Sequence, residues 1–100
     1  MGVDLDAVLE AFRSAVGGRI RRERERCELS QSALAHRMPA HVSASQISRW
    51  ERGRAFPELR SLAELAVALE VPIEAFFSDV RPPGRRRPSR FDPGVGRRRS

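Results

Sequence analysis

Residues 30–53 read SQSALAHRMPAHVSASQISRWERG, and this stretch decides the fold. Its first part combines a serine, which is a common helix N-cap residue, with apolar residues at helical spacing over 31–38. Pro39 then stops the pattern, because proline lacks an N–H and disfavours a helical residue before it. We therefore expect a short helix over residues 31–38.

The second part of the stretch predicts another short helix. Ser43 and Gln46 form the S-x-x-Q capping box that begins many helices. The helical pattern then runs to Gly53, a typical residue just after a helix end. Two short helices joined by a tight turn form a helix-turn-helix, a motif that places its second helix in the major groove of DNA.

The second helix has two chemically different sides. Ile47 and Trp50 share one side, so we expect them to lie in the core rather than stack on a base. The opposite side is small and polar and carries Ser45, Ser48, Arg49 and Arg52. Such a side suits a groove, since small residues allow the backbone to approach the base edges.

The polar side also carries groups that read or bind DNA. Ser45 and Gln46 donate and accept hydrogen bonds, and glutamine pairs with adenine, while Arg49 has the fork that pairs with guanine. Arg52 and Arg54, at the helix end and in the loop, are better placed for phosphates. The bland alternative is a solvated polar face.

The rest of the chain predicts further helices and no strands, so we expect an all-α fold. Residues 4–16 form an amphipathic segment with an apolar stripe, which fits either additional core or a dimer face. The pair Gly17-Gly18 leaves open whether 4–27 is one helix or two. We expect a fourth helix over 57–71 and a short fifth helix over 73–77.

Charge divides the chain into regions. Residues 1–77 contain equal numbers of arginines and acids, so the net charge of +6 lies entirely in residues 78–100. We expect an N-terminal helical extension (1–15), a DNA-binding domain (16–79) and a disordered arginine-rich tail (80–100). The tail fits a solvated charge run, a minor-groove arm or a protein-binding segment, and we favour non-specific phosphate attraction.

Several classes of protein are disfavoured. The single cysteine, Cys27, allows no internal disulfide, and neither a membrane-spanning run nor a signal peptide is visible, so a cytoplasmic location is expected. His36 and His41 lack further ligands at zinc-binding spacing. With no nucleophile–base pairing or phosphate-cradling loop, we expect no enzymatic activity, cofactor, metal or small-molecule ligand.

Residues 16–77 resemble the phage-repressor/Cro-type helix-turn-helix family, also called the XRE family. The stretches that carry the resemblance are VGGRIRRERE, LSQSALA, VSASQISRWERG and the leucine pattern that follows Pro57. The resemblance implies five helices, with the third as recognition helix, in a bacterial or phage-encoded, nucleoid-associated protein. It also implies a homodimer on a two-fold symmetric operator in double-stranded DNA.

The resemblance also implies roles for individual residues. Gln31 would contact a phosphate at the start of the second helix. Arg24 and Glu51 would form an ion pair between the first and third helices. The residues that would line the groove are Ser43, Ala44, Ser45, Gln46 and Arg49.

The chain departs from the family pattern at three places. The turn before Val42 contains Pro39-Ala40-His41 and is about two residues longer than the family's, which would tilt the recognition helix or weaken the docking of the helix before it. Glu70 replaces a helix-ending glycine, and Pro72 replaces a capping serine. These last two bear on stability rather than on DNA reading.

These observations predict a sequence-specific, repressor-like transcriptional regulator. The first alternative is an antitoxin-like or other protein-binding module whose tail binds a protein partner. The second is a non-specific nucleic-acid binder driven by the tail.

Overall fold

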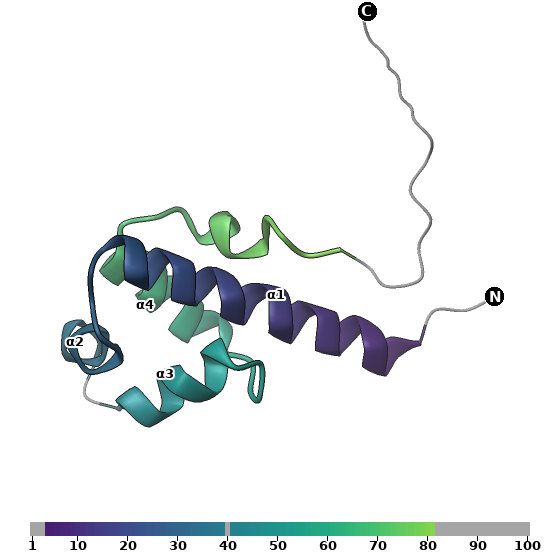
Figure 1. Ribbon diagram of the computed structural model, residues 1–100, viewed down its shortest axis with the longest axis horizontal. Coiled ribbons are helices and arrows are strands. Elements are labelled where there is room, and N and C mark those ends of the chain that lie inside the picture. Colours follow the sequence, from purple (N-terminus) through teal and green to yellow (C-terminus); the bar gives the residue numbers. More distant parts are fainter. Residues whose placement is uncertain (1–3, 40, 82–100) are drawn as a thin grey trace, which may run out of the picture.

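The computed structural model describes residues 4–39 and 41–81, and this part of the chain is helical and contains no strand (Figure 1). Its elements are α1 (Leu5–Arg26), α2 (Gln31–Arg37), α3 (Ala44–Glu51), α4 (Leu59–Leu69) and the 3-10 helix η1 (Ile73–Phe77). The all-α class is confirmed, and the expected fifth helix is a 3-10 helix rather than an α-helix. Within these residues no helix has the length and apolarity to cross a membrane. The expected tail falls almost wholly outside the described residues.

α1 is one continuous helix, which settles the question raised by the glycine pair. It begins at the predicted place, where the Asp4 side chain accepts a hydrogen bond from the Asp6 N–H at 3.1 Å. Val16 is the first fully buried side chain along it. The N-terminal half of α1 therefore projects beyond the other helices, as Figure 1 shows.

Serine caps start both helices of the central motif, as predicted. The Ser30 Oγ accepts from the Ala33 N–H at 3.0 Å, and the Ser43 Oγ accepts from the Gln46 N–H at 3.1 Å. Each cap satisfies a backbone donor that the helix itself leaves unpaired. α2 ends at Arg37 because Met38 is extended, with ψ 166°, as expected for a residue before proline.

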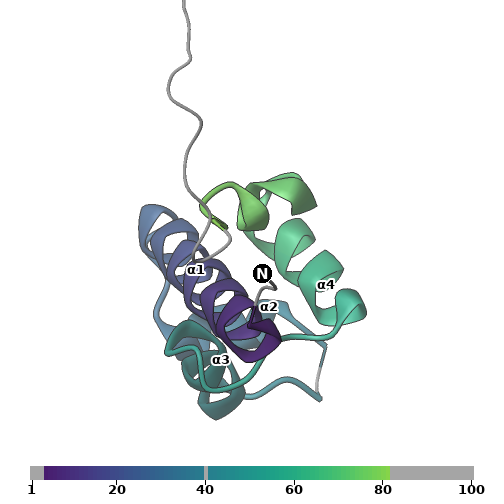
Figure 2. The same cartoon turned by 90° about the vertical axis from the view of Figure 1, so that its right-hand side faces the viewer.

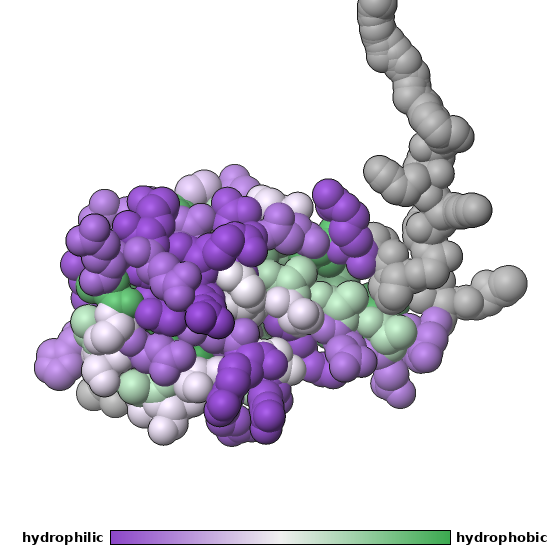
Figure 3. All heavy atoms as spheres, viewed as in Figure 1, coloured by the Kyte–Doolittle hydropathy of each residue, from purple (hydrophilic) through white to green (hydrophobic). Residues whose placement is uncertain are grey.

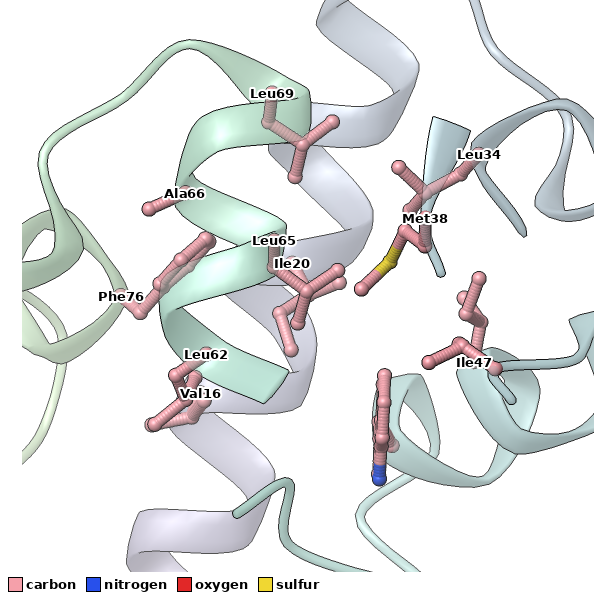
Figure 4. Packing of buried hydrophobic residues seen from close by; sticks show 12 residues of the cluster. Val16, Ile20, Leu34, Met38, Ile47, Leu62, Leu65, Ala66, Leu69 and Phe76 are labelled. Carbon is pink, nitrogen blue, oxygen red and sulfur yellow. The ribbon is translucent and has the colours of Figure 1, made fainter. Parts of the chain in front are cut away.

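The core is formed where all five elements meet (Figure 4). α1 and α4 face each other through apolar side chains, η1 adds the fully buried Phe76, and α2 and α3 close the other side. The fully buried side chains are Val16, Ile20, Leu34, Ile47, Leu62, Leu65, Leu69 and Phe76. This packing fixes α3 against α1. A helix as short as α3 is marginally stable alone, so contacts with the core stabilise it and set its position.

Two of the departures from the family pattern have visible backbone consequences. Glu70 ends α4 in the left-handed conformation, with φ 59° and ψ 46°, which an L-residue other than glycine adopts at a cost of about 1–2 kcal/mol. Pro72 begins η1 without a side-chain cap. Both features lie away from α3.

Candidate nucleic-acid interface

α3 separates its side chains as the sequence predicts. Ile47 is 0% exposed and Trp50 is 2% exposed, so both anchor the helix in the core. Ser45, Gln46 and Arg49 are exposed on the other side. The helix therefore presents a polar face while its apolar face holds it in place.

The remaining predicted contact residues surround this face. Ser43 is exposed at the N-cap, and Ala44 and Ser48 are partly exposed. Arg52 and Arg54 are exposed beyond the C-terminal end of the helix. Together with the exposed face of α3, these residues form a polar surface that extends along α3 and into the loop that follows it.

The polar surface is also positively charged. Arg49, Arg52 and Arg54 are in none of the ion pairs formed among residues 4–39 and 41–81. The nearest acid in the sequence, Glu51, is neutralised by Arg24. Three uncompensated guanidinium groups therefore face solvent near α3, which favours an anionic partner.

The C-terminal end of α3 is fixed by a glycine. Gly53 has φ 72°, and its N–H donates to the Trp50 carbonyl at 3.1 Å. The Arg54 N–H donates to the Arg49 carbonyl at 2.9 Å, which completes a Schellman motif. The predicted stop at Gly53 is confirmed, and the motif sets the path of the backbone that carries Arg54.

A bidentate ion pair ties α1 to α3. The Arg24 Nε and Nη2 atoms donate to the two carboxylate oxygens of Glu51 at 2.6 and 2.9 Å. The side chains are 11% and 3% exposed, so water screens the pair little. The hydrogen bonds from Arg24 to Glu51 raise the pKa of the guanidinium above its ordinary value.

α2 joins the same cluster. The Gln31 Nε2 donates to Glu51 Oε1 at 3.0 Å, and Arg24 Nη1 donates to the Leu29 carbonyl at 2.8 Å. Gln31 was expected to contact a phosphate, and the structure commits one of its amide hydrogens to Glu51. The second amide hydrogen and the side-chain oxygen of this half-buried residue have no partner among the described residues.

The long turn between α2 and α3 returns to the core through one residue. The Val42 N–H donates to the Pro39 carbonyl at 3.0 Å, and its side chain is only 5% exposed. Pro39 and His41 are exposed. Pro39 and His41 therefore lie at the surface, while Val42 provides a buried anchor directly before Ser43.

Gly17 is a residue whose importance the sequence analysis missed. A Cβ at this position would lie 2.2 Å from the Trp50 carbonyl oxygen, and Gly17 is buried in α1. Only glycine lets α1 approach the end of α3 this closely. A glycine inside an amphipathic helix indicates such a contact, but its partner is 33 residues away in the chain and is visible only in the fold.

Comparison with known proteins identifies the family. Residues 15–76 match the helix-turn-helix domain model. The chain belongs to the helix-turn-helix domain family. This confirms the resemblance that the sequence showed, and the matched region contains the whole of α2, α3 and α4.

Two individual proteins are similar to about two thirds of the chain. An uncharacterized transcriptional regulator in the ATPase CF(0) region of Rhodospirillum rubrum is 45% identical over 65 residues, which are 65% of this chain. The aligned region spans 58% of that relative's length. The crystal structure of the restriction-modification controller protein C.AhdI from Aeromonas hydrophila superposes with a TM-score of 0.62 at 29% identity. That match covers 68% of this chain and 96% of C.AhdI.

Proposed function

We propose that this helix-turn-helix protein is a transcriptional regulator that binds duplex DNA sequence-specifically through α3. The observation that carries the proposal is the division of α3 into an anchored side and an exposed polar side. Because Ile47 and Trp50 are buried, Ser45, Gln46 and Arg49 are held outward on a rigid support. Rigid presentation is what base readout in the major groove requires.

The exposed residues divide into base-reading and phosphate-binding groups. In this proposal Arg49 pairs with guanine and Gln46 with adenine, and each bidentate pair discriminates by about 1–3 kcal/mol against a wrong base. Gln31, Arg52 and Arg54 flank the helix and bind phosphates, which supplies affinity and register without sequence information. Ser43, Ala44, Ser45 and Ser48 complete the contact surface and are small enough for a close approach.

The protein acts as a homodimer on an inverted repeat and represses by occupying it. Dimers of helix-turn-helix proteins bind half-sites about one helical turn apart, so the symmetry of the site mirrors that of the protein. A single short recognition helix offers few base contacts. Two copies double the number of base contacts and the number of neutralised phosphates. The names of the two similar proteins, a transcriptional regulator and a controller protein, support regulation.

The test is selection of bound sequences from a random duplex pool. The wild-type chain should enrich a palindromic consensus, and Arg49→Ala should lose preference at one or two positions in each half. Arg60→Ala is a charge-matched control, because Arg60 is an exposed arginine on α4 that pairs with Glu64. Equal losses in the two variants, or enrichment of no consensus, would support the non-specific alternative driven by the basic tail.

A further inference from the structure

The N-terminal half of α1 carries an apolar stripe that no other described element covers. Leu5 is 67% exposed and Leu9 is 44% exposed, while Val8 and Phe12 are partly exposed. The same stripe continues into the core at Val16, which is 0% exposed. Figure 3 shows hydrophobic residues along this half of the helix, bordered by hydrophilic ones.

We propose that a second copy of this chain covers the stripe, with the two α1 helices packed antiparallel over residues 5–12. This inference rests on the proposed function, because it supplies the dimer that carries two α3 helices. The two-fold axis passes between Val8 and Leu9. Val8 of one copy then lies opposite Leu9 of the other, and Leu5 opposite Phe12, so each apolar side chain of the stripe meets another one.

Charges beside the stripe favour a second copy and set its direction. Asp6 and Arg13 are seven residues apart, so they lie two turns apart on the same flank of α1. Neither belongs to an ion pair within residues 4–39 and 41–81. An antiparallel pair brings Asp6 of each copy beside Arg13 of the other, whereas a two-fold parallel pair puts this flank of the two copies on opposite sides of the interface and leaves both charges unpaired.

The same arrangement turns both α3 helices to one side. Gly17 and Arg24 mark the side of α1 that contacts α3, and they lie roughly a third of a turn around α1 from the stripe. Figure 2, which looks along α1 from its N-terminal end, shows α3 and α4 on different sides of this helix. The two-fold axis runs perpendicular to the plane of the paired helices, so both α3 helices project to the same face.

The spacing also fits a DNA duplex. Gly17 lies about 12 Å along α1 from the pairing centre, so the C-terminal ends of two α3 helices are separated by roughly 25 Å along the pair. The rest of α3 lies from there towards the C-terminal end of α1, so the centres of the two α3 helices are farther apart than their C-terminal ends (Figure 1). Half-sites one turn apart are separated by about 34 Å. The paired helices are short, so we expect a dimer that dissociates on dilution and is strengthened by DNA.

The first test measures the dimer without DNA, by sedimentation equilibrium of the full chain over a concentration series. Leu9→Glu should raise the dimer dissociation constant by at least about tenfold, because it places two carboxylates in an apolar contact. Val67→Glu is the matched control, since Val67 is a surface residue on α4 that is 80% exposed. An unchanged dimer with Leu9→Glu, or a monomer with Val67→Glu instead, would overturn the proposal, as would a wild-type chain that is monomeric both free and on DNA.

The second test exchanges the charges. Asp6→Arg and Arg13→Asp should each weaken the dimer, and the double variant should restore it. An effect confined to one helix predicts that only Arg13→Asp is unfavourable, because Asp6→Arg turns a repulsion with Glu10, one turn away, into an attraction. An Asp6→Arg variant that dimerises as tightly as wild type, or a double variant weaker than both single variants, would therefore refute the antiparallel contact.

DNA binding separates this proposal from the proposed function. Leu9→Glu should bind an isolated half-site with wild-type affinity and lose the cooperative gain on the full palindrome. If Arg49→Ala leaves sequence preference unchanged while Leu9→Glu still dissociates the dimer, the function of α3 fails and the α1 pairing stands. If Leu9→Glu keeps wild-type cooperativity on the palindrome while Arg49→Ala loses sequence preference, the α1 pairing fails and the function of α3 stands.

Discussion

Arg24 and Glu51 join the first and third helices through two hydrogen bonds of 2.6 and 2.9 Å in a nearly buried position. The carboxylate also accepts from Gln31, so one acid connects three helices. Glu51 follows Trp50 directly on the helix that carries the polar face. The pair therefore fixes the orientation of α3 as well as its attachment.

Breaking this pair should destabilise the protein strongly. Glu51→Gln leaves the Arg24 charge without its counter-ion, and removing one partner of a buried pair costs about 3–5 kcal/mol. We expect a value near the lower end, because glutamine retains an acceptor oxygen. Thermal unfolding followed by circular dichroism measures the change.

The control for this prediction is an exposed ion pair within α1. Glu25→Gln removes the partner of Arg21, whose side chain is 63% exposed. Such pairs contribute about 0.3–0.5 kcal/mol. Similar losses from the two substitutions would mean that the Arg24–Glu51 pair adds nothing beyond a surface contact.

Replacing each glycine of the pair in α1 by alanine should change the free energy of unfolding in opposite directions. Gly17→Ala introduces a Cβ that would lie 2.2 Å from the Trp50 carbonyl oxygen, so α1 and α3 must separate, at a cost of about 1–3 kcal/mol. Gly18→Ala meets only the flexible end of Arg22, at 4.0 Å, and should gain about 0.5–1 kcal/mol from helix propensity. Urea unfolding of both variants checks the difference, and a shared sign would contradict the close packing of α1 on α3.

Much of the fold could be predicted because its signals are local. Ser30 and Ser43 cap helices through contacts within three residues, and Pro39 and Gly53 end segments by backbone chemistry alone. The inward side of α3 also follows from helical spacing. The two partners of each of these interactions are a few residues apart in the sequence, so the sequence alone is enough to predict them.

Features that depend on distant partners could not be predicted in the same way. Whether α1 would bend at Gly17 depends on the Trp50 backbone, which fills the space beside it. The contact of Gln31 with Glu51 depends on how α2 meets α3. The resemblance to known regulators placed Arg24 beside Glu51, a contact that neither spacing nor composition reveals.

Replacing Glu70 by glycine should stabilise the protein. Glu70 has φ 59° at the end of α4, where glycine avoids the cost of the left-handed conformation but loses more chain entropy on folding. The net expectation is a gain of about 0.5–1 kcal/mol, or several degrees in the unfolding temperature. Glu70→Ala is the control because it removes the carboxylate and keeps the Cβ, so an equal gain from alanine would locate the effect in charge rather than backbone.

Stability should fall in acid through Glu23. Its carboxylate accepts from Arg26 at 2.7 Å and Arg19 at 2.9 Å, and these hydrogen bonds, with that from Arg26 the stronger, lower its pKa below the ordinary value of 4.5. The unfolded chain therefore binds the proton more readily. This contribution is fully present above pH 4.5 and is lost as pH falls through the lower folded pKa.

The measurement for Glu23 is the free energy of unfolding by urea at a series of acidic pH values. Glu23→Gln should be less stable than wild type at neutral pH, and the difference should shrink below pH 4.5 as the wild-type carboxylate takes up its proton. A difference that stays constant across this range would show that the carboxylate charge contributes nothing to folding.

The salt dependence of DNA binding should distinguish phosphate contacts from base contacts on the polar surface. Arg54 lies in the loop after α3, held by its backbone hydrogen bond to Arg49, and its guanidinium is exposed. The proposed function assigns it to a phosphate. Arg54→Ala should reduce the slope of log affinity against log salt by about 0.9 for each phosphate that is no longer neutralised, and it should weaken all sequences alike. Arg49→Ala should instead weaken the preferred site more than random duplex, because the guanine contact proposed for Arg49 requires a guanine at that position. Competition titrations at several salt concentrations measure both quantities, and a selective loss with Arg54→Ala would exchange the roles assigned to the two arginines.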